Sequence, residues 1–418
     1  IYISSSDMTR ICNVSISDSE YALHIKSSNS TIIENVAITT SDFLIEDPQS
    51  YNETIIKDST YKGAPIVILN SSSNIYFSGG SFGAILIGFS GGKIENFETK
   101  YLQVYKCENL TIANIRVDES MHGIRVLYSF NITIKDTTIS SAYKGLEVVS
   151  SYEILICNVN FKNDYVGISL FDVNRTSIIN IYVEDSYYSV LLNQTMSHVL
   201  VESSEIRSCG YGIYIVNGGN ISIVGNEILD CSAGVEIESV MADSIIMIRN
   251  NLLNRNDIGV YIGYDLTSYI EICYNNITDN KNALVVHSSG VYVYGNLFVS
   301  NAFSNKIMID SRLDCSFNNS YFGNYWSCIN NIDVNKDGIV DEPYNIIGSY
   351  YDYLPIAFVP TIILNDTLLS ILANNTCTNT GQWMAVYKGN NATVTFYMNT
   401  TIITSSDGYI HIAHIDVM

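Results

Sequence analysis

Short strands of alternating apolar and polar residues recur along this chain at a nearly constant interval. Each unit begins with an apolar-x-apolar triplet, and the triplets are about 22 residues apart. The clearest triplets begin at Leu102, Ile124, Leu146, Ile168, Val190, Ile213, Val235, Val260, Leu284 and Ile307, and earlier ones are expected at Ile1, Leu23, Leu44, Ile66 and Ile85. Two further alternating stretches follow in each unit, so the pattern predicts three strands per unit and no sustained helix.

A unit of this length cannot bury its own apolar face, but units stacked at the ~4.8 Å strand spacing share a continuous core. The repeat therefore predicts an all-β fold, a right-handed parallel β-helix of about fourteen coils over residues 1–320. Asparagines near the breaks are expected to stack their amides between coils at a turn. These are Asn35, Asn114, Asn158, Asn180, Asn226, Asn251, Asn276 and Asn296.

The composition excludes some classes of function. Only 15% of the residues are charged, the formal net charge is −21, and 31 residues are tyrosine. Binding of nucleic acid needs a surplus of Lys and Arg on one face, so a nucleic-acid partner is not expected. A surface wetted by hydroxyls and amides suits an acidic exterior, because it does not depend on ion pairs that protonation would break.

Asn-x-Ser/Thr sequons are frequent, and each is an N-glycosylation site if the protein is exported. A chain rich in Asn, Ser and Thr also produces sequons by chance, but their number favours an extracellular or cell-surface glycoprotein. Several are expected on one turn, as a row of N-linked glycans. The sequons begin at Asn13, Asn29, Asn52, Asn70, Asn109, Asn131, Asn174, Asn193, Asn220, Asn276, Asn318, Asn365, Asn374, Asn391 and Asn399.

The nine cysteines show no CxxC pair. Cys209 and Cys231 lie at the same position of neighbouring units, which brings their Cα atoms within disulfide range. Two stacked thiols in the core are the alternative. Cys315 and Cys328 form a second candidate disulfide, and Cys377 could compete for either partner. The odd count leaves at least one thiol free or paired elsewhere.

Tyr143, Tyr165 and Tyr187 recur at one position of three successive units, and their rings are expected to stack. Such a ladder is either a platform for sugar or a cover for a sheet edge. The histidines share no metal-ligand spacing. A row of aspartates (Asp118, Asp164, Asp185 and Asp230) is interpreted as turn residues, so no catalytic residue is predicted.

Acidic residues alternate in the stretch NIDVNKDGIVDEPYNI, residues 331–346. Read as a calcium loop, its ligands are Asp333, Asn335, Asp337, the Ile339 carbonyl, Asp341 and Glu342, with Gly338 at the sharp bend. Tyr344 replaces the bidentate Glu of an EF-hand, so a shorter structural calcium loop is predicted. An Asx turn without metal is the alternative.

The stretch Tyr321–Ile356 contains GNYW, a D-x-N-x-DG-x-x-D loop, a Pro-Tyr pair and a D-x-x-P. With the repeats, it resembles the segment that ends NosD-like β-helix regions of archaeal cell-surface proteins. The resemblance implies a cap over residues 321–358. It does not carry copper to this chain, because Met, His and Cys do not cluster as copper ligands would.

Residues 359–418 alternate around a Ser-Ser-Asp-Gly turn and predict a small C-terminal β-domain. This domain is expected to dock on the helix end, complete a neighbour's sheet or continue past Met418. The chain has no apolar run of membrane-spanning length, so any leader or anchor is expected outside it.

These patterns together predict an exported, N-glycosylated protein with a structural or adhesive role at the cell surface. An S-layer-associated protein, a stalk and a filament component all fit, with other copies of the chain or other envelope proteins as partners. The alternative is a β-helix that binds or cleaves polysaccharide, a class of ligand common for this architecture.

Overall fold

The computed structural model describes residues 1–17, 21–39, 42–45, 54–70, 75–88, 91–195, 197–264, 268–301, 307–310, 313–330, 332–335, 338–357, 361–365, 383–388, 391–396, 400–404 and 410–415. These residues form strands joined by short turns, without a helix. Accordingly, the described residues contain no helix of the length and apolar character that crossing a membrane requires.

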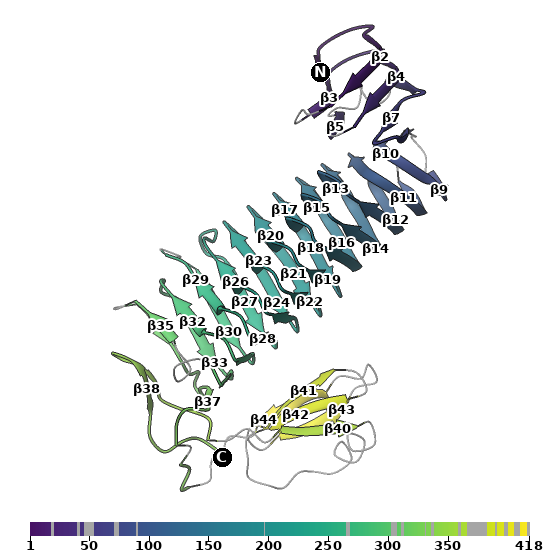
Figure 1. Cartoon of the computed structure of the whole chain (residues 1–418). Coiled ribbons are helices and arrows are strands. Elements are labelled where there is room, and N and C mark those ends of the chain that lie inside the picture. The colour runs from purple at the N-terminus through teal and green to yellow at the C-terminus, as the bar shows by residue number, and fades with distance from the viewer. Residues whose placement is uncertain are drawn as a thin grey trace.

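The chain winds into a parallel β-solenoid of about 13 coils, consistent with the predicted right-handed parallel β-helix (Figure 1). The first sheet contains the triplets. Its strands are β8 (Ala64–Asn70), β10 (Ser81–Gly88), β11 (Gly92–Tyr105), β13 (His122–Leu127), β15 (Lys144–Val149), β17 (Val166–Phe171), β20 (Tyr188–Asn193), β23 (Tyr211–Val216), β26 (Ala233–Ile237), β29 (Ile258–Ile262), β32 (Asn282–Val286) and β35 (Ile307–Ile309).

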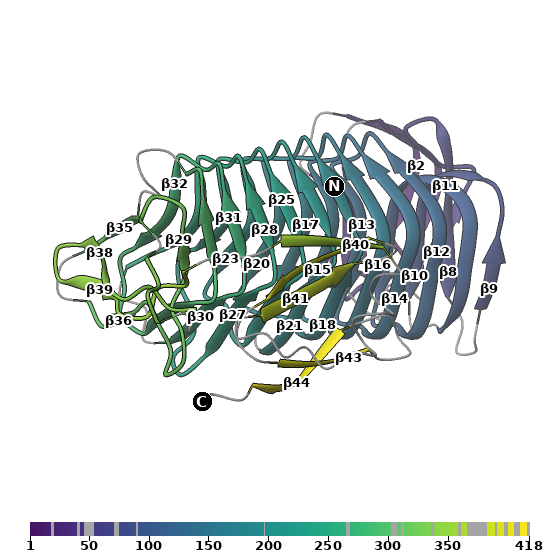
Figure 2. The same cartoon turned by 90° about the horizontal axis from the view of Figure 1, so that it is seen from below.

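The second and third sheets complete each coil, and Figure 2 shows the coils side by side along the solenoid. The second sheet contains β9 (Ile75–Ser78), β12 (Glu108–Asp118), β14 (Phe130–Ser140), β16 (Tyr152–Lys162), β18 (Asn174–Ile179), β21 (Ser197–Glu202), β24 (Ile221–Val224), β27 (Ile245–Arg249), β30 (Tyr269–Cys273), β33 (Val291–Tyr294) and β36 (Cys315–Ser316). The third sheet continues from β12, β14 and β16 through β19 (Tyr182–Glu184), β22 (Glu205–Arg207), β25 (Glu227–Leu229), β28 (Leu252–Asn254), β31 (Asn276–Thr278), β34 (Leu297–Val299) and β37 (Tyr325–Trp326).

The predicted register is confirmed for eleven successive triplets. Every triplet from Ile85 to Ile307 is paired in parallel, first residue to first residue, with the triplet of the next coil. The first and third residues of these triplets point inward and form one apolar cluster along the solenoid. The middle residue points to the outer face, because side chains alternate along a strand.

The prediction at Ile66 is wrong by one residue, because Ile66 pairs with Ala84 and Val67 with Ile85. A one-residue slip moves a strand's side chains to the opposite face. The cause lies just before, where β7 (Thr60–Tyr61) and β8 form an antiparallel hairpin. Lys62 and Gly63 have φ of +49° and +81°, the signature of a type I′ turn.

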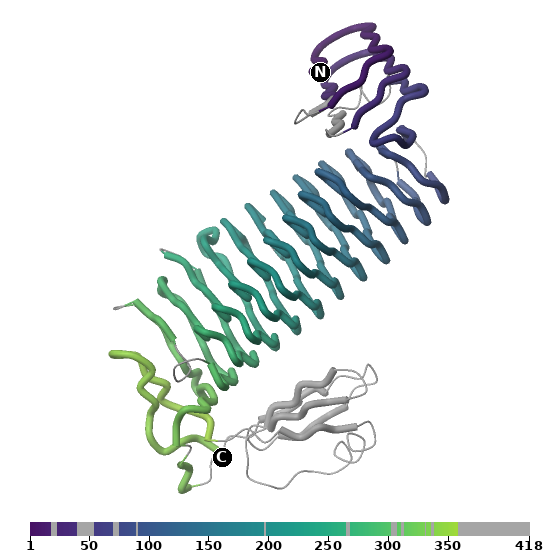
Figure 3. Tube along the Cα trace, in the orientation of Figure 1, coloured from purple at the N-terminus to yellow at the C-terminus, as the bar shows by residue number. Residues whose placement is uncertain are grey.

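The strands up to and including β7 form a separate group, displaced from the coils that follow (Figure 3). They are β1 (Tyr2–Ser4), β2 (Arg10–Ile16), β3 (Tyr21–Lys26), β4 (Ile32–Ile38), β5 (Asp42–Ile45), β6 (Ile55–Lys57) and β7. Their apolar residues form a second cluster with outward residues of the first sheet, among them Leu86, Tyr101 and Leu127. The core of the predicted 1–320 solenoid is therefore divided between two clusters.

Two buried asparagine ladders brace the later coils. In one, the Asn275 Nδ2 donates to the Asn296 Oδ1 (2.9 Å), and the Asn275 Oδ1 accepts from the Asn251 N–H (2.9 Å). This ladder runs from Asn226 to Asn324 and includes Asn275, so the predicted Asn276 is displaced by one residue. The other ladder contains Asn256, Asn280 and Asn301.

Asn114, Asn158 and Asn180, also predicted to stack, do so on the outside. The Asn180 Nδ2 donates to the Asn158 Oδ1 (2.7 Å), with all three residues in the left-handed region that Asn tolerates.

The strands after the coils pair antiparallel. β38 (Tyr344–Ile347) pairs with β39 (Tyr350–Asp352), β42 (Asn391–Phe396) pairs with both β40 (Thr361–Asn365) and β41 (Trp383–Lys388), and β43 (Thr400–Thr404) pairs with β44 (Ile410–Ile415).

Candidate functional site

The GNYW segment closes the C-terminal end of the core by continuing its ladders. The Asn324 Oδ1 accepts from the Asn296 N–H (3.1 Å), and its Nδ2 donates to the Val293 carbonyl (2.9 Å). The Trp326 indole stacks on Phe298 with 4.5 Å between the ring centroids. Asn-x-Trp thus replaces the Asn-x-apolar pattern of an ordinary coil, and the large ring covers the end of the stack.

Asp352, from the D-x-x-P part of the motif, is fully buried against this end. Its Oδ2 accepts from the Asn324 N–H (2.7 Å) and the Trp326 Nε1–H (2.8 Å), and its Oδ1 from the Leu354 N–H (3.1 Å). Burial raises the pKa of Asp352 to about 6 against these three bonds, which favour the ionised form. Gly323 makes room for the carboxylate, since a Cβ there would lie 1.8 Å from Oδ1.

The predicted calcium loop follows this cap. The Asp333 Oδ2 accepts from the Gly338 N–H (2.9 Å), and the Asp341 Oδ2 accepts from the Val334 N–H (2.8 Å). Gly338 has φ of +88°, as expected at the sharp bend. Both carboxylates are therefore turned toward the loop backbone.

The other predicted ligands are less gathered. Asn335 and Glu342 are exposed, and Ile339 forms an antiparallel bridge with Ile356 that ties the loop to the cap. Asp337 lies outside the described residues. Among the residues that are described, no three His, Cys, Asp or Glu side chains gather as a metal site requires.

Asn109, Asn131 and Asn220 lie at one position of their coils, directly before the first inward residue of the second-sheet strand. The Asn131 Nδ2 donates to the Asn109 Oδ1 (2.7 Å), and both residues are exposed. Asn174 falls one position earlier, opposite Tyr152, so the predicted row is correct only in part.

The remaining sequons are scattered. Asn13 and Asn276 are exposed, whereas Asn29, Asn174, Asn193, Asn220 and Asn318 are half-buried. Asn70, Asn365 and Asn391 lie within strands, and Asn52, Asn374 and Asn399 lie outside the described residues.

The predicted disulfides are not formed. Cys209 and Cys231 occupy the same position of adjacent coils, as expected, but both are buried free thiols that bond to backbone carbonyls of their own coils. Cys315 and Cys328 are also free; the Cys315 thiol donates to the Ser288 carbonyl (3.5 Å), and the Cys328 sulfur lies 3.4 Å from the Tyr344 hydroxyl. The stacked-thiol alternative describes the first pair.

The tyrosine ladder is present. Tyr143 and Tyr165 stack with centroids 5.0 Å apart, and Tyr165 and Tyr187 with centroids 5.2 Å apart, all within 3° of parallel. Both faces of the Tyr165 ring are therefore covered by its neighbours, and the exposed parts are edges and hydroxyls. This ladder therefore exposes little ring face on which a sugar could stack.

The aspartate row does not come together. Asp164 is buried, whereas Asp185 and Asp230 are exposed, with a coil between them. Asp230 is paired with Arg255 through two bonds of 2.8 and 2.6 Å.

A different group of residues does converge, on the outer face of the first sheet. We refer to it as the aromatic–carboxylate band. It spans five strands, β20, β23, β26, β29 and β32, and the segment after β35. Its members are Tyr188, Tyr211, Tyr214, Glu236, Glu238, Tyr261, Tyr264, His287 and Asp310.

The centre of the band is Glu236. The register places Glu236 directly between Tyr214 of the preceding coil and Tyr261 of the following one. Glu238 points to the same face two residues later and accepts a short hydrogen bond from the Tyr214 hydroxyl. Burial, and then the charge of Glu238, raise the pKa of Glu236.

Aromatic rings flank these carboxylates on one side. Tyr188, Tyr211 and Tyr214 form a compact group with centroid separations of 5.0 to 5.2 Å. Burial and the nearby Glu236 charge raise the pKa of Tyr211 to about 12, so its hydroxyl is protonated at neutral pH.

An imidazole flanks them on the other side. His287 stacks on Tyr264 with 4.2 Å between centroids, and its Nδ1 lies 2.8 Å from the Asp310 Oδ2. Between the Glu238 and His287 positions stands Gly263, where a Cβ would lie 2.7 Å from the Glu238 carbonyl oxygen. No side chain therefore separates the carboxylate from the imidazole along this row.

The sequence contained a signal for this band. Tyr214, Glu236 and Tyr261 are the middle residues of the triplets IYI, VEI and VYI, whose first and third residues set the register. Aligning those middle residues across coils would have placed them side by side.

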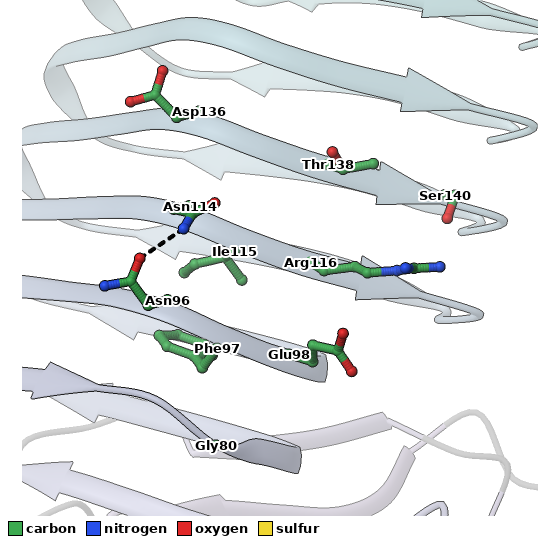
Figure 4. A pocket seen from close by; sticks show the side chains of 10 residues that line it. All are labelled: Gly80, Asn96, Phe97, Glu98, Asn114, Ile115, Arg116, Asp136, Thr138 and Ser140. Carbon is green, nitrogen blue, oxygen red and sulfur yellow. Dashed lines mark hydrogen bonds between the residues drawn. The ribbon is translucent and has the colours of Figure 1, made fainter.

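An open depression of about 520 Å³ lies between β11, β12 and β14, and Figure 4 shows the side chains that line it. Glu98, Arg116 and Thr138 follow one another across its strands, and the Asn114 Nδ2 donates to the Asn96 Oδ1 (2.6 Å). These groups lie along the strands without meeting at one point, so the band is the stronger candidate site.

The fold and the band define a β-solenoid with an aromatic, acidic outer face. Residues 87–247 match the family described as periplasmic copper-binding protein (NosD), which supports the NosD-like resemblance over those coils. Among the residues that the structure describes, no three His, Cys, Asp or Glu side chains gather as a copper site built from those ligands would need. Comparison with curated proteins finds no significant match.

Among solved structures, the chain is similar to DFA-IIIase from Arthrobacter chlorophenolicus A6 in complex with DFA-III. The identity is 11%, the TM-score is 0.34, and the match covers 73% of this chain and 87% of that one. A GH87 alpha-1,3-glucanase catalytic domain in complex with nigerose matches at 14% identity and a TM-score of 0.36, covering 76% of this chain and 64% of that one. Likeness at this level carries no argument about activity.

Proposed function

We propose that this chain is an exported, adhesive β-solenoid that holds a neutral polysaccharide against the outer face of its first sheet. The observation that carries the proposal is the aromatic–carboxylate band, in which tyrosines and carboxylates alternate in register across successive coils. Aromatic rings offer apolar faces to the C–H groups of a sugar, and carboxylates accept hydrogen bonds from its hydroxyls. The net charge of −21 disfavours an anionic polysaccharide.

An aromatic substitution tests the binding. We expect Tyr261→Ala to weaken binding of neutral polysaccharides about tenfold, the loss that one stacking contact implies. Tyr152→Ala is the matched control, because Tyr152 is 49% exposed and stacks on Phe130 but lies on the second sheet. Affinity electrophoresis in gels containing starch, laminarin or dextran measures both variants. Equal loss in the two variants, or no retardation of the wild type in any gel, would contradict the proposal.

Placement at the cell surface is part of the same proposal. Asn109 and Asn131 lie exposed at the same position of neighbouring coils, which suits a short row of N-linked glycans. A rigid stack of coils also suits a stalk, an S-layer-associated protein or a filament component. In each case other copies of the chain or other envelope proteins are the partners.

The loop at residues 332–342 is proposed to bind calcium as a clasp on the cap. Asp333 and Asp341 both turn a carboxylate toward the backbone of the same loop, and carboxylate oxygens are ligands that calcium prefers. We expect EGTA to lower the unfolding free energy by about 2 to 3 kcal/mol relative to calcium at a hundred times its Kd. Thermal melts at pH 7 measure this, and Asp341→Asn should remove most of the difference. Identical melts of the wild type with and without EGTA would count against the clasp.

A further inference from the structure

The aromatic–carboxylate band contains the parts of an acid–base site as well as a binding surface. β26 sends Val235 and Ile237 inward, so Glu236 emerges on the outer face, and Glu238, the first residue after the strand, is exposed as well. Residues two apart on a strand are about 6.6 Å apart at Cα. Inverting glycoside hydrolases hold their two carboxyl groups about 6.5 to 9.5 Å apart with a water molecule between them, a separation that side chains from such neighbouring outward positions can reach.

The two carboxyl groups have different surroundings. Glu236 is half-buried between the rings of Tyr214 and Tyr261, which favour its neutral, protonated form. Glu238 is exposed and accepts a hydrogen bond from the Tyr214 hydroxyl. Two carboxyl groups in different environments, one half-buried between rings and one open to water, are the arrangement that acid–base catalysis uses.

The third group of the proposed site is the imidazole of His287. The Asp310 carboxylate engages the His287 Nδ1, which directs the Nε2 side of the ring away from Asp310. The Tyr264 ring fixes the plane of this imidazole by stacking on it. Since Gly263 contributes no side chain between Glu238 and His287, a sugar ring can lie on the sheet at this point. His287 is a positioning residue for a sugar hydroxyl.

We infer that this band hydrolyses a glycosidic bond of the polysaccharide it holds, with Glu236 as general acid and Glu238 as general base. This inference rests on the proposed binding function. Glu236 gives its proton to the glycosidic oxygen as the bond from that oxygen to the anomeric carbon breaks. A water oxygen bonds to the anomeric carbon and passes one proton to Glu238. The products are a hemiacetal and an alcohol, and the proton on Glu238 returns through solvent to Glu236.

The first test is turnover by the intact chain. Wild-type protein is incubated with the polysaccharide that it retards most strongly in the gels, and new reducing ends are counted. We expect Glu236→Gln and Glu238→Gln each to lower the rate by 10² to 10⁴, the range for loss of an acid or base. Glu271→Gln is the matched control, because Glu271 also accepts from a tyrosine of the next coil, Tyr294, but on the second sheet. Its rate should be unchanged.

The second test separates a catalytic role from a structural one. A dinitrophenyl glycoside of the released sugar has a leaving group that needs no proton. Glu236→Gln should therefore retain its rate on this substrate within tenfold, whereas Glu238→Gln should lose 10² or more. Equal losses of Glu236→Gln on both substrates would overturn the acid role. Wild-type protein that binds polysaccharide but releases no reducing ends would overturn the hydrolysis and leave the binding function intact, whereas absence of binding would overturn both.

Discussion

Lowering the pH from 8 to 5 should raise the unfolding free energy by about 4 kcal/mol through two buried aspartates. Burial raises the pKa of Asp164 from 3.8 to about 7 and that of Asp352 to about 6. In both cases the folded state holds a proton that the unfolded chain releases. Their contribution is therefore complete below pH 3.8 and is lost as the pH rises through 6 and 7.

Asp164 contributes more of this pH dependence than Asp352, and its position in the ladder that contains Asn256 explains why. Asp164 lies three residues after Phe161, as Asn256 lies three after Leu253, and its Oδ1 accepts the Ala142 N–H (2.7 Å) as asparagine does elsewhere in this ladder. Asn256 donates its Nδ2 to the carbonyl of the preceding coil. The Asp164 Oδ2 is buried without a partner, and only a protonated carboxyl can donate there.

The variant Asp164→Asn supplies that donor at every pH. We expect it to be more stable than the wild type at pH 8 and to lose roughly 3 of the 4 kcal/mol of pH dependence. Urea titrations from pH 5 to 8 in excess calcium measure this, with Glu147 outside the window because its pKa is lowered below 4.5. A variant with the pH dependence of the wild type would show that Asp164 does not titrate in this range.

The substitution Gly323→Ala should remove about 3 to 5 kcal/mol of stability, the cost of breaking a buried charged hydrogen-bond network. The new Cβ would lie 1.8 Å from the Asp352 Oδ1 and 2.4 Å from its Cγ. The carboxylate must then move off the Asn324 N–H and the Trp326 Nε1–H, which loses its only buried acceptor among the described contacts. Denaturant unfolding followed by tryptophan fluorescence measures the loss.

Gly348→Ala is the control for this substitution. A Cβ at Gly348 meets no atom within 4 Å, and its φ of +58° costs about 1 kcal/mol in any case. If the two variants lose the same free energy, the close approach of Asp352 is not what requires glycine at position 323.

The solenoid could be predicted because its signal is periodic and local. The alternation fixes which side chains face inward, and the interval fixes which triplets pair, so the register holds from Ile85 to Ile307. The failure at Ile66 has an equally local cause, the hairpin turn at Lys62 and Gly63, which reverses the chain without changing the hydrophobic pattern. A pattern search does not detect a change of direction.

The site was harder to predict because its chemistry lies between coils. Glu236 becomes unusual only when Tyr214 and Tyr261 are placed on either side of it, residues 22 and 25 positions away in sequence. Asn275 and Asn276 illustrate the same limit, because one residue decides whether an amide lies in the buried ladder or on the surface. Composition and spacing limit where a side chain can lie, and the packing of adjacent coils decides whether it is buried or exposed.

The two ends of the main core differ in a way that bears on mechanical load. At the C-terminal end Trp326 and Asp352 are fully buried and the partly buried Tyr344 packs against Trp326, whereas the last apolar residues at the opposite end, Leu69, Ile75, Phe77 and Phe82, are themselves only partly buried. Because each coil contacts only its neighbours, a pulled solenoid peels from its weakest end, one coil at a time. Under tension the coils at the C-terminal end would stay folded, whereas the coils at the opposite end would unfold first and release the load on the rest of the solenoid.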